Sequence, residues 1–423
     1  MQKQEKLGIW YSLYGRLLSE SVLERAYMKV KSANGAPGID GESIKDFGEA
    51  LQENLGVLVG ELRKKSYRPK PVKRVEIPKP NGGVRKLGIP AVRDRIVQQA
   101  VLEILTPIYD PGFHPSSYGY RPGRSCHDAI RKAELFMRRY DLGYVVDMDL
   151  SACFDTLNHD FLMRQLQKKI ADGSMLKLIE LFLKSGVMVG DELKEVTEGS
   201  PQGGVISPLL ANIYLDYFDQ WSRERGYRIV RYADDTLIFS RSHKAAVRRL
   251  KAATAVLEGE MGLRVNEQKT QVTSLGKGVE YLGVVIRTTY TTIQHKKVKQ
   301  FKEKVKQLTN RSGGKPLWRV IAELNPLLRG FAHYFRIANC KGRFREFMTW
   351  IRRRLRAIQL RLWKKPRRLH RRLRQLGYSG VFLYIKMQSW ASARSPLASM
   401  AMPNGWLYEQ GLYNMELVFS VHR

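Results

Sequence analysis

The sequence predicts an α+β fold that is followed by a basic, helical C-terminal segment. Two observations lead to this. Up to about residue 290, short strand-like apolar runs alternate with stretches of helical hydrophobic spacing and with loops rich in Gly and Pro. Beyond that point the pattern is helical, rich in Lys and Arg, and interleaved with aromatic residues. Mixed elements followed by helices are typical of an α+β core with a helical appendage.

The elements of the first part follow in a clear order. The first ~50 residues have a helical pattern and end in the loop NGAPGIDG at 34–41. Two strand-like runs in 72–90 flank Pro80-Asn81-Gly82-Gly83, which is a strong hairpin signal. Residues 93–109 have apolar residues at helical spacing, and Pro111 stops that helix.

The remaining core elements alternate strands and helices. A buried strand begins at Tyr144 and turns into a loop or helix by Leu162, and a helical stretch continues to about Gly186. The later elements are a Gly/Pro loop feeding a long apolar helix at 199–221, a strand, tight turn and strand at 227–240, an amphipathic helix at 243–261, and one further strand at 279–286.

Composition limits the class of protein. The chain has 423 residues, is 43% apolar and 27% charged, and is therefore globular and long enough for two to four domains. The three cysteines, Cys126, Cys153 and Cys340, lie far apart, so neither a zinc site nor a disulfide framework is indicated and a reducing compartment fits. No signal-peptide pattern and no apolar run of the ~20 residues that a membrane span needs is found.

The charge is strongly positive and unevenly distributed. Lys and Arg number 73 against 40 Asp and Glu, which gives a net charge of +33. Residues 291–380 hold 26 Lys and Arg but three Glu, a local excess of +23. A merely solvated face explains this poorly, because acidic partners at i,i+4 are almost absent. Such an excess repels itself unless a polyanion neutralises it, so we expect a nucleic acid partner and, as the weaker alternative, an anionic membrane.

Two acidic clusters carry the chemistry. Asp234 and Asp235 sit between two apolar runs, where ordinary turn chemistry would also accept them. Asp147 and Asp149, two apart on an apolar strand, face the same way, and carboxylates at a buried sheet are costly unless paired or bound to cations. Asp149, Asp234 and Asp235 would make a site for two Mg²⁺ ions, which prefer carboxylate and phosphate oxygens. This predicts phosphoryl transfer.

These motifs together closely resemble the reverse transcriptases encoded by group II introns, in particular the small, endonuclease-lacking, bacterial group IIC-like type. The motifs are YADD at 232–235, DMDLSACFD at 147–155, SPQGGVISPLL at 200–210, VEIPKPNGGVRKLGIP at 75–90, SSYGYRPGRSCHDAI at 116–130 and LNPLLRGFAHYFRIA at 324–338. The valine-threonine-glycine string of retron enzymes is absent, and Pro201-Gln202 stands where diversity-generating enzymes carry serine-glutamine.

The resemblance implies a right-hand polymerase, with fingers and an antiparallel palm sheet, then an α-helical thumb and a small helical DNA-binding tail. The implied domains are an N-terminal extension at 1–50, fingers at 51–135, palm with part of the fingers at 136–290, thumb or maturase domain at 291–365 and DNA-binding domain at 366–423. Since no HNH endonuclease pattern follows, priming from a pre-existing 3′ end is expected.

The same resemblance assigns roles to individual residues. Asp149, Asp234 and Asp235 correspond to the catalytic metal ligands, with Leu150 adding a backbone carbonyl, whereas Asp147 is expected to be structural. Phe154 corresponds to the steric gate against a ribose 2′-hydroxyl; its alternative is a core residue. The residues implied to contact the incoming dNTP are Lys79, Arg85, Leu150, Phe154 and Gln202, and Lys269 is implied to protonate the leaving pyrophosphate. Lys79 and Arg85 could instead be solvated hairpin charges.

The basic segment at 350–376 is expected to grip nucleic acid. Ile351, Leu355, Ile358 and Leu362 fall at helical spacing, so this helix would pack on one side and carry charge on the other. The charged face would present Arg352, Arg353, Arg354 and Arg356 to phosphates. Such contacts hold the backbone of a duplex without reading its sequence.

The predicted function is an RNA-directed DNA polymerase that also assists intron splicing and retrohoming as a maturase. Implied partners are an RNA template with a DNA primer, dNTPs, the intron RNA and target DNA, with no membrane; the implied cofactor is two Mg²⁺ ions, with Mn²⁺ as a substitute. The implied location is the cytoplasm of a bacterium, in a nucleoid-associated ribonucleoprotein. Two alternatives stay open: a maturase-only RNA-binding protein, and a domesticated relative in DNA repair or phage defence.

Overall fold

The structure is a computed structural model that describes residues 8–78, 84–189, 192–194, 199, 203–380 and 396–420. The chain divides into two compact units, Met1–Ser274 and Leu275–Arg423. The division falls inside the range expected for the palm, 136–290, because the strands after Ser274 pair with one another and not with the sheet before it.

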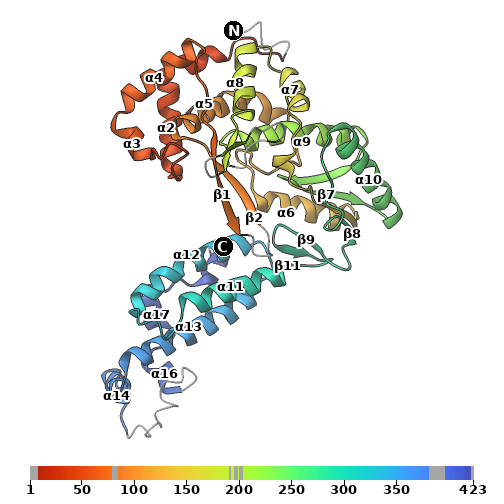
Figure 1. Ribbon diagram of the computed structural model, residues 1–423. Helices are drawn as coiled ribbons and strands as arrows, with labels where there is room; N and C mark the ends of the chain where they lie inside the picture. The colour runs from red at the N-terminus through yellow and green to blue at the C-terminus, as the bar shows by residue number, and fades with distance from the viewer. Residues whose placement is uncertain are drawn as a thin grey trace. The chain divides into compact units, whose positions relative to one another are not determined.

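The first unit includes the helical elements η1 (Tyr14–Leu18), α2 (Glu20–Ala33), α3 (Ile44–Glu49), α4 (Leu51–Arg63) and α5 (Val92–Tyr109). The helical patterns of the first ~50 residues and of 93–109 predict helices in those ranges, whereas α4 lies outside both. Figure 1 shows α2, α3, α4 and α5 gathered in one group. Ser43 and Asp46 cap the start of α3 reciprocally, which satisfies two of its free backbone N–H groups. The expected loop lies between α2 and α3.

The predicted hairpin is present. Strands β1 (Val72–Pro78) and β2 (Val84–Ile89) are antiparallel, with Pro78 opposite Val84. The predicted turn, Pro80 to Gly83, lies outside the described residues. On its other edge β1 pairs in parallel with β4 (Val187–Val189), and β4 pairs in antiparallel fashion with β5 (Glu192–Lys194). The sequence does not indicate either pairing.

The second sheet of this unit is antiparallel throughout, in the order β6-β7-β3-β8. Its strands are β3 (Tyr144–Met148), β6 (Arg228–Tyr232), β7 (Asp235–Ser240) and β8 (Gln271–Ser274). Tyr232 lies opposite Asp235, which leaves a two-residue turn, as predicted. Met148 lies opposite Thr236, so the register brings the end of β3 beside the start of β7.

Helices surround this sheet: α6 (Cys126–Glu134), α7 (His159–Gln167), α8 (Gly173–Leu183), α9 (Ser207–Glu224) and α10 (His243–Ala255), with the short helical turns η2 (Asp110–Gly112), η3 (Leu135–Arg139), η4 (Cys153–Asp155) and η5 (Val256–Glu260). The long apolar helix expected after the Gly/Pro loop is α9. Its Leu210, Tyr214 and Phe218 are almost fully buried, and each such side chain contributes roughly 1.5–3 kcal/mol.

The second unit begins with a small antiparallel sheet, β9 (Val279–Tyr281), β10 (Val284–Ile286) and β11 (Thr291–Ile293). The prediction of one strand over 279–286 is wrong, since the chain reverses at Leu282-Gly283. Both residues have positive φ, 44° and 83°, which glycine adopts readily. The apolar run hides this turn because both short strands are buried.

The elements described after β11 are helical, as predicted: α11 (His295–Leu308), α12 (Leu317–Phe335), α13 (Lys341–Trp363), α14 (Pro366–Gln375), α16 (Pro396–Ala401), α17 (Asn404–Glu409) and η6 (Met415–Phe419). Figure 1 shows α11, α12 and α13 side by side. Phe301 stacks on Phe331 at 4.1 Å between ring centroids and also contacts Phe347. Within the described residues, no helix combines the length and apolar character that a membrane crossing requires.

Candidate active site

The turn between β6 and β7 presents Asp234 and Asp235. Ala233, the first turn residue, has a φ of +58°, in the left-handed region that short hairpin turns use. A neighbouring segment approaches it closely: a Cβ on Gly119 would lie 2.2 Å from the Ala233 backbone nitrogen. The turn is therefore fixed both by strand pairing and by a glycine that lets a second backbone touch it.

Asp149, just beyond the end of β3, is held by the loop that follows α10 and η5. Its backbone N–H donates to Thr270 Oγ1 at 3.2 Å, and its carbonyl accepts from the Asn266 N–H at 2.9 Å. Its carboxylate Oδ2 accepts from Asn266 Nδ2 at 3.1 Å and from Lys269 Nζ at 2.9 Å. Loop 266–270 thus fixes both the backbone and the side chain of Asp149.

The carboxylates of the two strands lie close enough to repel one another. Burial, followed by the charges of Asp234, Asp149 and Asp147, raises the pKa of Asp235 to about 7, against the opposing charge of Lys269. Burial raises the pKa of Asp234 as well, and Asp149 adds to the effect, while Arg85 and Lys269 act against it. The arrangement concentrates negative charge that is only partly neutralised, which favours a bound cation.

The oxygen atoms of these carboxylates are of the chemical type that binds divalent metal ions. Among the described residues, no group of three or more His, Cys, Asp or Glu side chains is already arranged around a common point. One reason is visible: Oδ2 of Asp149 is engaged by Lys269, whose own pKa that hydrogen bond raises. Carboxylate oxygens that repel one another are nevertheless the ligands that Mg²⁺ prefers, and an ion would relieve their repulsion.

The predicted gate residue, Phe154, contacts Tyr120, on whose hydroxyl the charge of Asp234 acts. Leu150 is buried and forms an isolated antiparallel β-bridge with Val265. Phe154 follows in η4. The Phe154 ring meets Tyr120 edge-on, with centroids 6.3 Å apart and an interplanar angle of 78°. Tyr120 is 54% exposed. Burial of its ring and then the charge of Asp234 raise the pKa of its hydroxyl.

Sequence reasoning missed Tyr120. It has a φ of +56°, a conformation rare for an aromatic residue and a mark of functional positions. The signal that could have found it is its place directly after Gly119, in a motif already compared with the fingers of reverse transcriptases.

The predicted nucleotide contacts are only partly described. Arg85 lies on β2 opposite Ile77, and its charge lowers the pKa of Asp234, so it is near the aspartates. Lys79 and Gln202 lie outside the described residues. Gly203, next to Gln202, approaches β2 so closely that a Cβ there would lie 2.2 Å from the Gly88 carbonyl oxygen.

The expectation that four arginines of α13 share one exposed face is wrong for two of them. Arg352 and Arg356 are each 8% exposed. Arg352 donates to the Tyr408 hydroxyl at 2.8 Å, and Arg356 donates to the Met402 carbonyl and to Asn404 Oδ1, both at 2.8 Å. The C-terminal segment covers this side of α13 and supplies neutral acceptors, which the spacing within one helix does not reveal.

The other two arginines differ from each other. Arg354 is partly buried and donates from Nε to Thr309 Oγ1 at 2.6 Å and from Nη2 to the Thr309 carbonyl at 3.0 Å. Arg353 is exposed, as predicted. Of these four side chains, Arg353 is therefore the one best placed to meet a phosphate.

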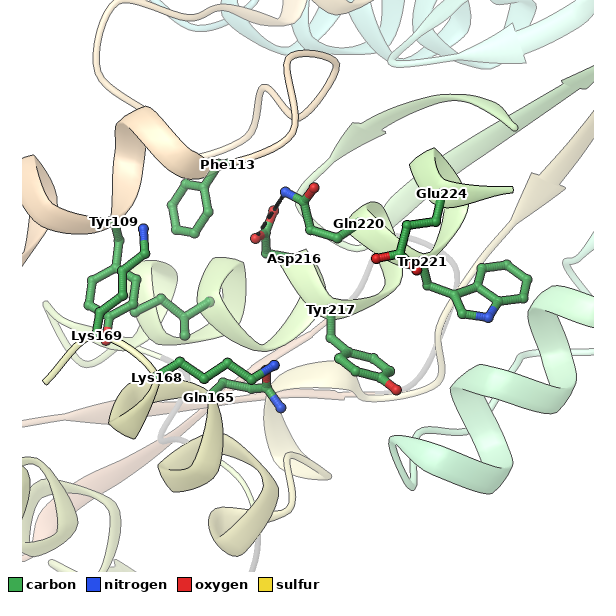
Figure 2. Close-up of a pocket in the computed structure, with 11 residues that line it drawn as sticks. Tyr109, Phe113, Gln165, Lys168, Lys169, Asp216, Tyr217, Gln220, Trp221 and Glu224 are labelled. Carbon is green, nitrogen blue, oxygen red and sulfur yellow. Dashed lines mark hydrogen bonds between the residues drawn. The ribbon is translucent and has the colours of Figure 1, made fainter. Parts of the chain in front are cut away.

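A pocket of about 280 Å³ lies away from the predicted site residues and includes none of them (Figure 2). Lys168 stands over the Tyr217 ring and Lys169 over the Tyr109 ring, at 5.5 and 5.2 Å from the centroids. Asp216 and Glu224 oppose these two cations in the lining. Its mixed charge indicates no ligand class, so the candidate site remains the one around the aspartates.

Comparison with known proteins identifies the family of this chain. Residues 77–286 match the family described as reverse transcriptase (RNA-dependent DNA polymerase), and residues 298–377 match the maturase-specific domain of group II introns. Protein YkfC of Escherichia coli strain K12 is 37% identical over 293 residues, covering 60% of this chain and 76% of that protein. The group II intron-encoded protein LtrA of Lactococcus lactis is 34% identical over 264 residues, covering 61% of this chain and 43% of LtrA.

The chain thus combines the domain of an RNA-directed DNA polymerase with a maturase domain, which confirms the predicted fold and enzyme class. It belongs to the family of group II intron-encoded reverse transcriptases and maturases. Reverse transcriptases depend on divalent metal ions and act on nucleic acids, so the family accounts for both the acidic cluster and the basic excess.

Proposed function

We propose that this protein copies RNA into DNA at Asp149, Asp234 and Asp235 and assists the splicing and mobility of a group II intron. The observation that carries the proposal is the register of β3 and β7, with Met148 opposite Thr236, because it brings the three carboxylates together from distant parts of the sequence. Transfer of a nucleotidyl group depends mainly on positioning and charge neutralisation, and this is the chemistry that the cluster is suited to supply.

Asp149, Asp234 and Asp235, with the backbone carbonyl of Leu150, would hold two Mg²⁺ ions, and Mn²⁺ is the expected substitute. When bound, such ions activate a primer 3′-hydroxyl and stabilise the leaving pyrophosphate. Lys269 neutralises Asp149 through its 2.9 Å ion pair. Its side chain is 66% exposed, and its ammonium is the proposed proton donor to pyrophosphate.

The incoming dNTP would meet groups from three segments. Arg85, with Lys79 and Gln202, would bind the triphosphate and line the nucleotide pocket, since phosphate oxygens are best matched by cationic donors. Phe154 would exclude a ribose 2′-hydroxyl. The edge-on contact with Tyr120 supports this role, because it restricts the Phe154 ring from one side.

The second unit would bind the RNA template with its DNA primer, the intron RNA and target DNA. The excess of +23 in residues 291–380 supports this, as does the match of 298–377 to the maturase-specific domain. Phosphate neutralisation by Lys and Arg provides most of such affinity. A complex with intron RNA in the bacterial cytoplasm, associated with the nucleoid, is the corresponding location.

The test is primer extension on an RNA template with dNTPs and Mg²⁺, comparing wild type with Asp234→Asn. Asp160→Asn, an exposed aspartate at the start of α7, is the matched control. We expect extension by the wild type and by the control, and none by Asp234→Asn, with RNA binding equal in all three. Absence of extension by every protein, with tight RNA binding retained, would refute the polymerase proposal and favour a maturase-only protein.

A further inference from the structure

A buried ion pair lies beneath the turn that carries Asp234. Arg231, on β6, is 1% exposed, and Asp219, on α9, is fully buried. Nε of Arg231 donates to Asp219 Oδ1 and Oδ2 at 2.9 and 3.0 Å, and Nη2 donates to Oδ2 at 2.6 Å. This two-pronged pairing fixes the plane of the guanidinium and leaves Nη1 pointing elsewhere.

Nη1 of Arg231 reaches the catalytic turn itself. It donates to the Ala233 carbonyl oxygen at 2.9 Å and to Asn212 Oδ1 at 3.0 Å. The Ala233 carbonyl belongs to the peptide group that joins Ala233 to Asp234, and Ala233 is the residue with left-handed φ. A fixed donor on this carbonyl therefore sets the direction in which the chain enters Asp234.

The same network includes the segment that leads to Tyr120. Asn212 Nδ2 donates to the Gly119 carbonyl oxygen at 2.9 Å. The Arg231 backbone N–H donates to the Ser116 carbonyl, and the Tyr118 N–H donates to the Arg231 carbonyl, both at 2.9 Å. Arg231 and Asn212 thus connect α9, the turn of the aspartates and the backbone next to Tyr120.

Stability alone is a weak reason for this arrangement. The free energy lost when both charges are removed from water offsets much of the free energy gained from their attraction. Well-packed apolar residues at such positions often stabilise a core equally well. What apolar residues cannot supply is a directed donor to a turn carbonyl. Orientation to within a fraction of an ångström is what a catalytic constellation needs from its supporting residues.

We propose that Arg231, locked by Asp219 and Asn212, is a positioning residue that sets the Ala233–Asp234 peptide and thereby the geometry of the two turn carboxylates relative to Asp149. This rests on the proposed polymerase function. Arg231 touches none of the reacting groups, so its loss should act on the chemical step and on metal affinity while template and dNTP binding persist.

The experiment measures kcat, the KM for dNTP, the Mg²⁺ concentration for half-maximal extension and the Kd for primer–template, all on the full chain. Arg231→Lys keeps the charge but cannot make all five contacts. Asn212→Ala keeps the ion pair and the bond from Arg231 to the Ala233 carbonyl, and it removes the contacts of Asn212 with Arg231 Nη1 and with the Gly119 carbonyl. It therefore tests the proposal even where the first variant fails to fold. Asp216→Asn, one turn earlier on α9 with no hydrogen bond to Arg231 in the described residues, is the matched control.

We expect Arg231→Lys to lower kcat by about ten- to hundredfold and to raise the Mg²⁺ midpoint several-fold. Asn212→Ala should shift both in the same direction by less, and Asp216→Asn should shift neither. Wild-type kcat and Mg²⁺ midpoint in a folded Arg231→Lys, or in Asn212→Ala, would overturn the proposal. An inactive wild type would instead refute the polymerase function, and this inference with it.

Discussion

Arg231 in the first unit and Arg356 in the second are both buried, but their partners differ in charge. Arg231 is paired with Asp219, and although burial opposes its charged form, this pairing keeps the pKa of its guanidinium raised. Arg356 donates to two neutral oxygens, the Met402 carbonyl and Asn404 Oδ1, and burial, with repulsion from Arg352, lowers the pKa of its guanidinium. The charge of Arg231 is therefore compensated locally, whereas that of Arg356 adds to a large basic excess.

This difference fits the functions that we propose for the two units. A catalytic turn must not move when a polyphosphate arrives, so the charge that supports it is neutralised locally. A surface for nucleic acid gains from every uncompensated cation within reach, because phosphates provide the missing charge. The two units should therefore respond differently to metal, to substitution and to salt.

The largest expected difference between the two units is their response to removal of divalent metal ions. Chelation of divalent ions should lower DNA synthesis at least about 10³-fold, because the carboxylates then face the reacting phosphate without compensation. Binding of a short, unstructured RNA at constant ionic strength should change little, since the basic helices hold phosphates by themselves. Fluorescence anisotropy and primer extension on the same samples measure both.

A fall in RNA affinity that parallels the fall in DNA synthesis would contradict this prediction. It would mean that the acidic site also organises the RNA-binding surface. Restoring Mg²⁺ should return the synthesis rate fully, which controls for damage to the protein.

Substitution of the two buried arginines should have unequal costs. Arg231→Met leaves Asp219 charged and unpaired in the core and should destabilise the first unit by about 3–5 kcal/mol. Arg356→Met loses hydrogen bonds to neutral oxygens, worth no more than about 1.5–3 kcal/mol, and also removes a buried charge. Because two units do not unfold as one, hydrogen exchange of peptides from α9 and from α13 should report each separately.

The double variant Arg231→Met with Asp219→Leu provides the control. Removing both charges should restore much of the lost protection in α9. Equal loss in the single and the double variants would show that the pair contributes through shape and not through charge.

Ribose selection should show a smaller effect. Phe154→Ala should raise incorporation of ribonucleotides relative to deoxyribonucleotides by roughly 10–100-fold, because the 2′-hydroxyl then meets no ring. Tyr120→Asn, a residue that tolerates positive φ, should raise it less, and Tyr120→Phe, which keeps the ring, should not. A Tyr120→Asn enzyme with wild-type discrimination would remove Tyr120 from the gate.

What could be predicted from the sequence was local. The turn at Asp234 and Asp235 and the strand before Asp149 follow from short apolar runs and turn residues, and each can be found within ten residues. Tyr120 and Arg231 were missed because their surroundings depend on the parallel bridge between Ser117 and Arg231, a pairing across more than a hundred positions. No periodicity within either segment indicates that contact.

The error over the arginines of α13 has the same cause. Helical spacing in α13 identifies the apolar stripe correctly, with Ile351, Leu355 and Ile358 buried. It cannot tell that a segment some fifty residues later covers a second side and removes Arg352 and Arg356 from solvent. A charged side chain was taken as exposed because burying one is costly, yet neutral oxygens on the C-terminal segment are sufficient here.

The smallest expected effect is on the salt dependence of RNA binding, which should differ between Arg353 and Arg356 of α13. Arg353→Gln removes an exposed cation, so the slope of log K against log salt for RNA should become shallower by about 0.7–0.9 if one phosphate contact is lost. Arg356→Gln should leave the slope unchanged, because its guanidinium is already used by Met402 and Asn404. Binding titrations over a fourfold range of salt resolve the two. A shallower slope for Arg356→Gln with an unchanged one for Arg353→Gln would mean that the C-terminal segment leaves α13 when RNA binds and that the buried arginines are the true contacts.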